Sequence, residues 1–450
     1  MKVVKFGGTS LANAEQIKKV CTIILSDPER RIAVVSAPGK RNREDTKVTD
    51  MLIACADSAL AGRDVNASTG RVIVRFAEII SGLGVETGLL KEIGDDLYKR
   101  LSMDRSNPRK FTDAVKAAGE DYCARIVASY MASLGEDAYY ASPMEAGLYL
   151  SAEFGNAQVL PQSYENIAKA LKDKTGVAIF PGFFGYTTDG EIVTFPRGGS
   201  DITGSILAAA VDAELYENFT DVDSVFAANP SVIDSPASIK VLTYREMREL
   251  SYSGFSVFHE EALEPVYRKG IPVCIKNTNN PSAPGTLISR SRDDCNGPVT
   301  GVACENGFCS ITMSKYLMNR EIGFGRKLLQ VFEEEGLSYD HTPSGIDNIS
   351  VILKESKLGN GVEQKVIKRI REQLEVDEIG IQRDLSLVMI VGEGMRHTVG
   401  ITARATSALA ASSVNIEMIN QGASEASIMF GVLKKDADKA VKALYNEFFS

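Results

Sequence analysis

The chain has 450 residues, more than one ordinary domain holds, and this length predicts two or three domains. Its formal charge of −9, from 59 acidic and 50 basic residues, disfavours nucleic acid as the main partner. The seven cysteines lack zinc-type paired spacing and no apolar run reaches the length of a membrane span, so we expect reduced thiols in a cytoplasmic protein that does not enter a membrane.

The first predicted strand ends in a lysine and runs into two glycines. The segment Lys5-Phe6-Gly7-Gly8-Thr9-Ser10 follows an apolar pair, and a helical pattern over residues 12–25 comes next. Backbone N–H groups at a glycine turn and a helix N-terminus form a cradle for an anion, to which a lysine adds a point charge suited to phosphate. A tight strand-to-helix turn with an exposed lysine is the alternative.

Strand and helix patterns then alternate as far as about residue 289. This alternation predicts a largely parallel sheet with helices on both faces. The predicted strands include 32–36, 177–180 and 273–276, and the predicted helices include 49–60, 124–134 and 261–269. The charged segment 99–108 is interpreted as a surface connection. Polar residues follow a short strand at 286–288, and we place the end of the first domain at residue 292.

A second cation with a glycine pair lies far along the chain. Arg197-Gly198-Gly199-Ser200-Asp201 follows a predicted strand at 191–195 and precedes an alanine-rich helix predicted over 202–211. Arg197 can hold a carboxylate in a bidentate fork. Asp201 falls in the first helical turn, where the helix dipole favours a carboxylate with or without a catalytic role. Together the two turns predict a site for a phosphate or a carboxylate.

The last third contains an internal repeat. Each copy reads strand–helix–strand–strand–helix, which is typical of a ferredoxin-like module. The helices are predicted at 325–335 and 361–374 in the first copy and at 399–411 and 436–448 in the second. We therefore expect domains at 293–382 and 383–450, with a strand at 299–311 as a segment that could complete the second. A repeat that serves dimerisation alone is the alternative to one that binds a ligand.

These motifs resemble, in order and spacing, those of the aspartate kinases, which are members of the amino-acid kinase family. The opening lysine–glycine run and the Arg197–Asp201 run are the specific ones. The supporting segments are Val34 to Gly39, Val48 to Asp50, Gly119-Glu120, Phe154 to Ala157, and Thr220 to Val222 followed by Pro230. The repeat resembles paired ACT domains, regulatory modules that bind amino acids at their mutual interfaces. The resemblance implies an α/β fold: a three-layer catalytic domain with a mostly parallel sheet, followed by two ferredoxin-like ACT domains.

The reaction that the resemblance implies moves the γ-phosphoryl group of ATP to the β-carboxylate of L-aspartate. The product is 4-phospho-L-aspartate, in the first step of lysine, threonine and methionine biosynthesis. A side-chain carboxylate is ionised at pH 7, so the nucleophile needs no general base. Catalysis is then mostly positioning and charge neutralisation by cations, backbone donors and Mg²⁺. A catalytically weak amino-acid sensor that keeps the fold is the alternative.

The resemblance assigns roles residue by residue. Catalysis is assigned to Lys5, Gly8 and Asp201. The aspartate pocket is assigned to Thr49, Glu120, Arg197 and Ser200, with Arg197 on a carboxylate and Glu120 on the α-ammonium group. The nucleotide is assigned to Lys5, Gly7, Gly8, Ser10, Thr220, Asp221, Phe226 and Ser231. No protein side chain is assigned to the metal, since ATP phosphates are expected to hold most of the Mg²⁺ coordination.

The resemblance also implies feedback regulation through the first ACT module. Its effector-binding face is assigned to Met318, Gly323, Phe324, Gly325, Ser338, Tyr339 and Asp340. Because Asp340 can meet an ammonium group, we predict lysine as the inhibitor, with threonine as the alternative. We expect a homodimer through the ACT domains, with a tetramer as the alternative.

The sequence departs from the family pattern at three positions. Phe226 stands in place of a tyrosine, Ser231 in place of an arginine, and Ser256 in place of a second ATP-binding lysine. Loss of the arginine and the lysine weakens nucleotide binding unless another cation supplies the charge. Lys276 and Arg268 are candidates by closeness in sequence. Because Lys5, Arg197 and Asp201 are all present, we interpret the departures as marks of a subfamily.

Overall fold

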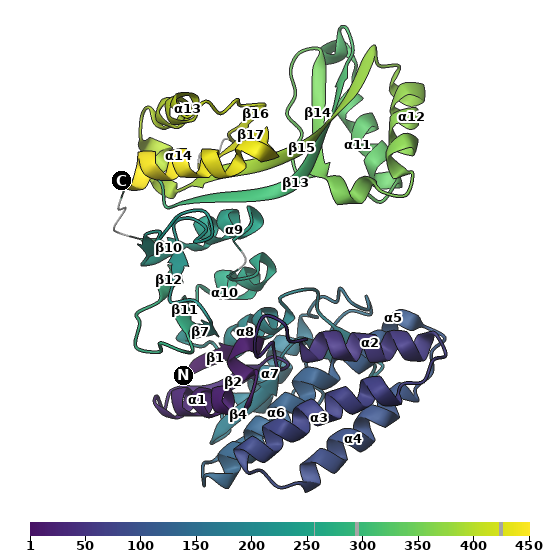
Figure 1. Ribbon diagram of the computed structural model, residues 1–450, viewed down its shortest axis with the longest axis vertical. Helices are drawn as coiled ribbons and strands as arrows, with labels where there is room; N and C mark the ends of the chain where they lie inside the picture. Colours follow the sequence, from purple (N-terminus) through teal and green to yellow (C-terminus); the bar gives the residue numbers. More distant parts are fainter. Residues whose placement is uncertain (256, 293–296, 423–425) are drawn as a thin grey trace. The chain divides into compact units, whose positions relative to one another are not determined.

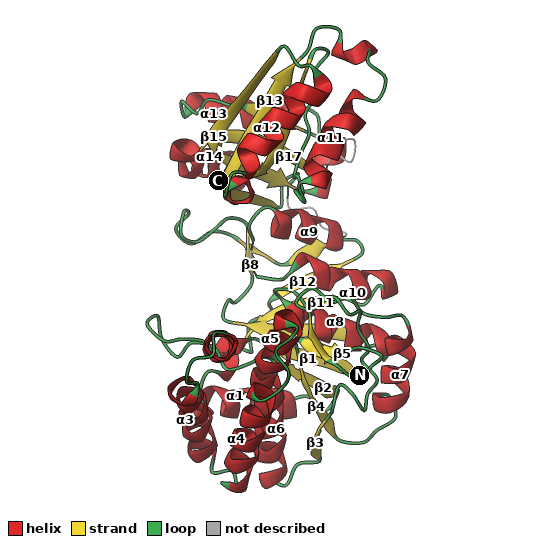
Figure 2. Ribbon diagram, turned by 90° about the vertical axis from the view of Figure 1, so that its right-hand side faces the viewer, coloured by secondary structure: helices red, strands yellow, loops and turns green. Residues whose placement is uncertain are grey.

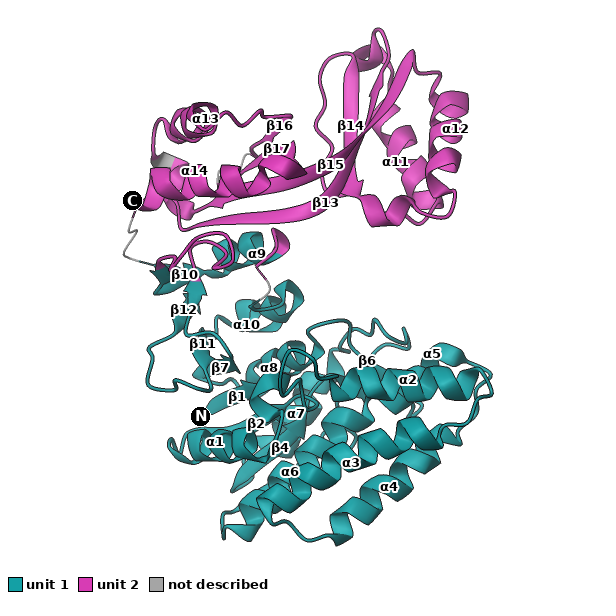
Figure 3. Cartoon of the chain, viewed as in Figure 1, with its two compact units in different colours: residues 1–225, 238–251, 256–293 teal, residues 226–237, 252–255, 294–450 magenta. Residues whose placement is uncertain are grey.

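The computed structural model describes residues 1–255, 257–292, 297–422 and 426–450. The chain divides into two units, which Figure 3 shows in different colours. Unit 1 comprises residues 1–225, 238–251 and 256–293, and unit 2 comprises residues 226–237, 252–255 and 294–450. No helix in the described part of the chain is long and apolar enough to cross a membrane.

Unit 1 is built on a sheet of eight strands in the order β10-β12-β11-β7-β1-β2-β4-β3. Every neighbouring pair is parallel except β11 with β12, as the alternation of strands and helices in the sequence predicts. The strands are β1 (Lys2–Phe6), β2 (Arg30–Val35), β3 (Ala138–Tyr140), β4 (Val177–Pro181), β7 (Leu215–Thr220), β10 (Val241–Thr243), β11 (Val273–Asn277) and β12 (Thr286–Ser289). The short strands β5 (Phe184–Tyr186) and β6 (Ile192–Thr194) form an antiparallel pair beside it.

Helices cover both faces of this sheet (Figures 1 and 2). One face shares a core with α1 (Ala14–Leu25), α2 (Val48–Leu60), α3 (Asn66–Leu83), α4 (Gly88–Leu101), α5 (Pro108–Lys116) and α6 (Ala118–Ser133). Val4 and Phe6 project from β1 into that core. The helix α8 (Gly199–Ala210) packs against β1 and β7, and the helices α7 (Gln162–Leu171) and α10 (Leu263–Lys269) pack against α8. Because side chains alternate along a strand, Lys5 points from β1 to the α8 side.

Several helices begin at other residues than the pattern predicts. The helix predicted from residue 12 begins at Ala14, where Asn13 caps it by accepting a hydrogen bond from the Gln16 amide at 3.0 Å. A 3₁₀ turn over Gly8–Leu11 lies between the first strand and this helix. The helix predicted from residue 124 begins six residues earlier, at Ala118, and the helix predicted from residue 202 begins at Gly199.

The region between residues 61 and 117 holds three helices, α3 to α5, that the sequence reading did not predict. The predicted surface connection at 99–108 is shorter, since α4 runs to Leu101 and α5 begins at Pro108. Asn107 caps α5 by accepting from the Lys110 amide at 3.2 Å, and the proline occupies a first-turn position that needs no N–H donor.

Unit 2 contains a five-stranded antiparallel sheet in the order β14-β13-β15-β17-β16. The strands are β13 (Gly301–Ser314), β14 (Asn348–Lys354), β15 (Glu378–Val391), β16 (Met418–Asn420) and β17 (Ser427–Leu433). The helices α11 (Phe324–Glu334) and α12 (Val362–Leu374) cover one half, and α13 (Ile401–Ala411) and α14 (Ala437–Phe449) cover the other (Figure 1). The helix α9 (Tyr244–Tyr252) and the two-residue strands β8 (Val225–Phe226) and β9 (Ser238–Ile239) lie where the chain passes between units.

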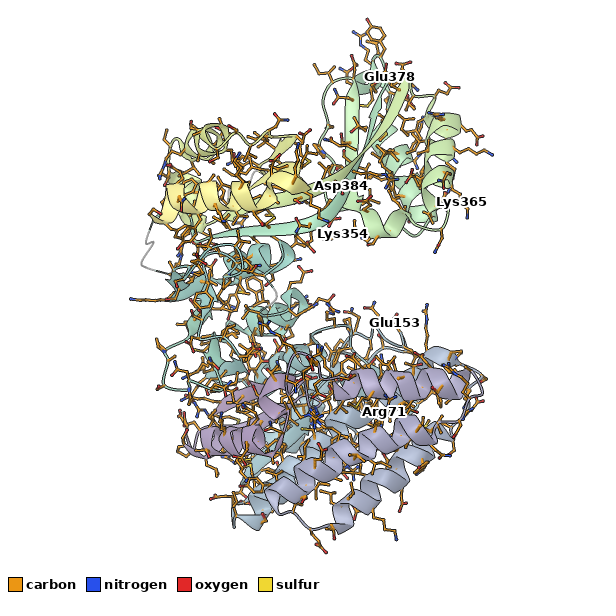
Figure 4. All side chains as sticks on the ribbon, in the orientation of Figure 1. Arg71, Glu153, Lys354, Lys365, Glu378 and Asp384 are labelled. Carbon is orange, nitrogen blue, oxygen red and sulfur yellow. The ribbon has the colours of Figure 1, made fainter. Side chains whose placement is uncertain are left out.

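The two copies of the repeat share their central strands, because β13 and β15 are each fourteen residues long and run through both halves. Ile311 of β13 lies in the core under α11 and α12, and Val302 of the same strand lies in the core under α13 and α14. The register between β13 and β15 shifts twice, near Gly307 and again near Asp384, which has a left-handed φ of 55°. Figure 4 labels Asp384 and Lys354 in this part of the sheet.

Candidate active site

Lys5 and Asp201 meet in an ion pair that joins the two glycine turns. The Lys5 Nζ atom lies 2.6 Å from Asp201 Oδ1, and only 8% of the lysine surface is exposed. Asn218 donates to the same oxygen at 2.8 Å from β7. The parallel register pairs Lys5 with Asn218, so their side chains leave neighbouring strands on the same face. Strand register and helix α8 together fix the lysine.

The start of α8 brings Arg197 to the same turn as Asp201. Gly198 is the N-cap of the helix and has a left-handed φ of 82°, and a Cβ atom there would lie 2.6 Å from the Cβ of His259. Arg197, one residue earlier, is exposed, whereas Ser200 in the first helical turn is 8% exposed. The turn therefore presents an exposed guanidinium and a helix N-terminus at one place, which suits an anion.

The glycine turn after β1 lies at the carboxyl end of the parallel strands. The Gly7 amide donates to the Phe219 carbonyl of β7 at 3.1 Å, and the chain then enters the 3₁₀ turn over Gly8–Leu11. The first N–H groups of such a turn have no acceptor within it, so they are available to a ligand. Strand order changes direction at β1, since β2 lies on one side and β7 on the other, and open parallel sheets bind ligands at such a point.

Glu120 is a buried carboxyl group beside the turn that follows β2. It is 5% exposed, and its Oε2 atom has no hydrogen-bond partner in the described part of the chain. Burial raises the pKa of Glu120 to about 8, a shift that backbone hydrogen bonds from Ala37 and Glu120 itself and the charge of Lys116 only partly offset. A buried acid with an unpaired oxygen is suited to a cationic ligand group.

Close packing holds Glu120 near the start of α2. A Cβ atom on Gly119 would lie 2.8 Å from the Cβ of Ala37 and 3.5 Å from Val48. The Val48 amide donates to the Pro38 carbonyl at 3.1 Å and so fixes the first turn of α2, which carries the half-buried Thr49. The structure thus gathers Thr49 and Glu120 around one turn.

The remaining nucleotide residues of unit 1 lie at the ends of neighbouring strands. The Ser10 hydroxyl is 2.7 Å from that of Thr278, directly after β11. Thr220 ends β7 and donates to the exposed Asp221 carboxylate at 3.2 Å. These three assigned residues therefore share the edge of the sheet that carries the Lys5 turn.

Two family models match the chain. The model described as "Amino acid kinase family" matches residues 1–277, and the model described as "ACT domain" matches residues 388–448. Aspartokinase 3 of Bacillus subtilis (strain 168) is 56% identical over 450 residues, which cover 100% of this chain and 99% of that protein. The chain belongs to the aspartate kinases.

Solved structures agree with this assignment. The crystal structure of Clostridium acetobutylicum aspartate kinase superposes with a TM-score of 0.87 at 38% identity, and all of both chains is covered. E. coli aspartokinase III, solved with aspartate and ADP, gives a TM-score of 0.79 with full coverage of both chains, and its 23% identity supports the fold alone. The predicted family, the predicted α/β fold with C-terminal ACT domains, and the predicted ATP-dependent phosphotransferase acting on aspartate are confirmed.

Two of the three residues that depart from the family pattern lie in unit 2. Phe226 and Ser231 belong to unit 2, where Ser231 bonds to Asn229, and their nucleotide roles stay predictions. Ser256 lies outside the described residues. Of the two candidate replacement cations, Arg268 pairs with Glu264 on the kinase surface. Lys276 is on β11, and its ammonium lies 5.9 Å from the centroid of the Phe219 ring.

The effector residues assigned to this kinase are all in unit 2. Met318 and Phe324 are 7% and 4% exposed and lie in the core under α11 and α12, so their side chains serve packing and a ligand would meet their backbone. Gly323 caps α11 with a left-handed φ of 80°, and Gly325 follows in the first turn. The Ser338 hydroxyl accepts from Lys357 at 2.6 Å.

Asp340 is the acidic residue of this assigned effector set. Its Oδ1 accepts from the Tyr252 hydroxyl at 2.6 Å, while its Oδ2 is buried with no partner among the residues described. Tyr339, which precedes it, is 44% exposed. The unpaired oxygen fits the prediction of a cationic ligand group at this position.

The sequence reading missed Asn218 as part of the Lys5 cluster. The signal was a polar pair, Glu217-Asn218, inside an otherwise apolar strand; both are at most 4% exposed. A buried polar residue on the strand next to Lys5 needs a partner, and that requirement could have indicated the contact with Asp201.

Proposed function

We propose that the two glycine turns form the site at which this kinase brings ATP and aspartate together. The Lys5–Asp201 contact of 2.6 Å carries the proposal, because it ties the lysine of the first turn to the helix that begins with the second. Arg197 is four residues from Asp201 on the same turn. The site then offers a cation to each of two anions that would otherwise repel each other.

In this proposal the aspartate substrate attacks in its ionised form, and the protein positions it. Arg197 holds a substrate carboxylate, Glu120 holds the α-ammonium group, and Thr49 and Ser200 complete the pocket. Lys5 neutralises charge on the transferring phosphoryl group, and Asp201 and Asn218 hold its ammonium in place. The amide of Gly8 and the hydroxyl of Ser10 face the phosphates, and Gly7, whose own amide is held by Phe219, lets them approach the backbone closely.

Mg²⁺ would neutralise charge on the ATP phosphates. No group of three His, Cys, Asp or Glu side chains suited to a metal ion occurs among the described residues. Lys5 and Asn218 both contact Oδ1 of the Asp201 carboxylate, so Oδ2 is the oxygen that this residue would offer to the metal. This donor set fits Mg²⁺, which proteins usually hold through one or two carboxylates with substrate phosphates and water.

The nucleotide would extend from the glycine turn across the ends of β7 and β11. Thr220 and Asp221 then lie near the adenosine. Aspartate-dependent release of ADP is the test of this assignment, and the variant Lys5→Met decides it. Binding of amino acids without aspartate-dependent release of ADP would instead support the alternative, a catalytically weak amino-acid sensor.

We infer the same domain division that the sequence predicts: a catalytic domain over 1–292 and ACT domains over 293–382 and 383–450. The last boundary falls inside β15, which both halves of the sheet share. The ACT domains would join two copies of the chain, with a tetramer as the alternative. The enzyme would catalyse the first step in the biosynthesis of lysine, threonine and methionine, and one of these end products would inhibit it.

Lysine should bind the kinase and inhibit it, and threonine is the alternative ligand. The buried, unpaired Oδ2 of Asp340 supports a ligand with a side-chain ammonium group. Isothermal titration should give binding for lysine, and Asp340→Asn should weaken it by about 10–100-fold, since a desolvated charge pair is lost.

Asp384→Asn is the matched control for that titration. Asp384 is exposed in β15, and asparagine tolerates its left-handed backbone. Lysine affinity should be unchanged in this variant. Binding of neither amino acid to the intact kinase would remove the proposal of feedback at this face.

A further inference from the structure

Arg75 is a buried arginine at the centre of three segments that lead into the active site. It projects from α3, and only 2% of its surface is exposed. Its guanidinium donates to the Ala12 carbonyl at 2.9 Å, to the Gly39 carbonyl at 2.7 Å and to Asp45 at 2.7 Å. These acceptors belong to the end of the 3₁₀ turn after β1, to the turn after β2, and to the loop that leads into α2.

The two turns that Arg75 joins are in direct contact. The Gly39 amide donates to the Gly8 carbonyl at 2.7 Å. A Cβ atom on Gly39 would lie 2.5 Å from the Gly8 carbonyl carbon, and one on Gly8 would lie 2.9 Å from the Ala37 carbonyl oxygen. No side chain can separate the turns, so their spacing depends on the groups that hold them from the α3 side.

The loop of residues 39–47 is held to α3 at a second point. Arg41 pairs with Asp45 within the loop at 2.8 Å and with Glu78 of α3 at 2.6 Å. Arg75 and Glu78 are three residues apart and therefore share a face of the helix. The positive and negative side chains of α3 thus meet a negative and a positive side chain of the loop, which ends two residues before Thr49.

We propose that Arg75 is a positioning residue for phosphoryl transfer, which fixes the Gly8 turn and the loop of residues 39–47 in the spacing the reaction needs. This inference rests on the proposed role of the Gly8 turn as the phosphate cradle. Arg75 touches neither substrate. It acts through the peptide units whose carbonyls it holds. Because a planar trans peptide points its N–H away from its carbonyl, fixing each carbonyl also fixes the direction of the N–H on the opposite side.

Arginine suits this role for a geometric reason. Its rigid fork can serve acceptors on different segments at once, which a lysine cannot do with one rotating ammonium group. Its charge is balanced by Asp45, whose pKa the guanidinium of Arg41 and that of Arg75 hold well below the usual range.

The test compares kcat and KM in Arg75→Met, Arg75→Lys and the wild type, each assayed well below its melting temperature. Displacing a cradle by about 1 Å costs on the order of 100-fold in rate. We expect kcat to fall about 30–100-fold in Arg75→Met and at least 10-fold in Arg75→Lys, while the KM for aspartate changes less than threefold. Asp45→Asn, which loosens the clamp from the loop side, should lower kcat in the same direction even where Arg75→Met does not fold.

Two arginines serve as controls. Arg30→Met removes an equally buried pair, because Arg30 bonds to Glu217 at 2.7 Å and to the Ile23 carbonyl, but it does so at the amino end of the strands. It should lose stability with kcat within twofold of the wild type. Arg71→Met removes an exposed arginine one turn earlier on α3, labelled in Figure 4. This variant should change neither the stability nor kcat.

Outcomes separate this inference from the proposed function. If Lys5→Met abolishes turnover while Arg75→Met and Asp45→Asn keep kcat within threefold, the positioning role is wrong and the cradle stands. If Arg30→Met lowers kcat as much as Arg75→Met, the loss reflects general destabilisation and the positioning role is likewise wrong. If Lys5→Met keeps its activity, the cradle itself is misassigned.

Discussion

Replacing Lys5 with methionine should lower kcat for aspartate-dependent ADP release by about 10³-fold. The ammonium is almost fully buried and held by Asp201, so it is preorganised where charge develops on the transferring phosphoryl group. Removing one preorganised donor from such a site costs on the order of 10²–10³ in kcat, and loss of a full charge belongs at the upper end. Methionine keeps the length of the side chain and therefore the packing.

Lys2→Met is the matched control for Lys5→Met. Lys2 lies on the same strand, three residues earlier, and pairs with Asp27 at 2.7 Å and Glu29 at 3.0 Å. Its removal should leave kcat within about twofold of the wild type, because Lys2 lies at the amino end of β1, away from the glycine turn. Equal turnover by Lys5→Met and the wild type would contradict the assignment of the catalytic lysine.

Replacing Glu120 with glutamine should stabilise the free enzyme and impair aspartate binding. The pKa of Glu120 is raised to about 8 in the folded state, against 4.5 in an unfolded chain. Below pH 4.5 the group is protonated in both states and has no effect. Between pH 4.5 and 8 the unfolded chain ionises first, so the free energy of unfolding falls as pH rises. Glutamine removes this dependence and should add roughly 2–4 kcal/mol at pH 8.

Aspartate should reverse the protonation of Glu120 when it binds. Its α-ammonium group favours the ionised carboxylate, so binding at pH 6.5 should release a proton, which titration calorimetry in buffers of different ionisation enthalpy measures. Glu120→Gln should abolish this release and raise the KM for aspartate by about 30–100-fold, as expected for a lost charge-assisted contact.

Glu217→Gln is the matched control, since Glu217 is also a buried carboxylate, 4% exposed, and pairs with Arg30 at 2.7 Å. It should lower stability and leave both the proton release and the KM for aspartate unchanged. Unaltered aspartate binding in Glu120→Gln would remove Glu120 from the substrate pocket.

The strongest sequence signals concerned the parts of the fold that follow local rules. The glycine runs around Gly8 and Gly198 predicted both turns, because turn geometry and a helix start leave a clear pattern in residue type. The contact of Lys5 with Asp201 could be expected only through the family resemblance. No periodicity within either segment indicates which strand lies beside which helix.

Other parts depend on tertiary packing that leaves no local pattern. The sequence does not distinguish Arg75 from Arg71, yet of these two arginines only Arg75 is buried. From the sequence alone, Glu120 is expected to be an exposed acid at the start of a helix. It is buried in the structure because Gly119 lets α6 approach the turn at Ala37. The sequence indicated that a strand at 299–311 could complete the second module, but it did not indicate that the same strand continues into the core of the first.

A crystal structure of this kinase with aspartate and a non-hydrolysable ATP analogue tests the convergence of the two turns most directly. The result we predict has the terminal phosphate of the analogue within hydrogen-bond distance of Lys5 Nζ and an aspartate carboxylate within that distance of the Arg197 guanidinium. Bound ligands that occupy separate surfaces, or that leave either cation without an anion, would contradict it.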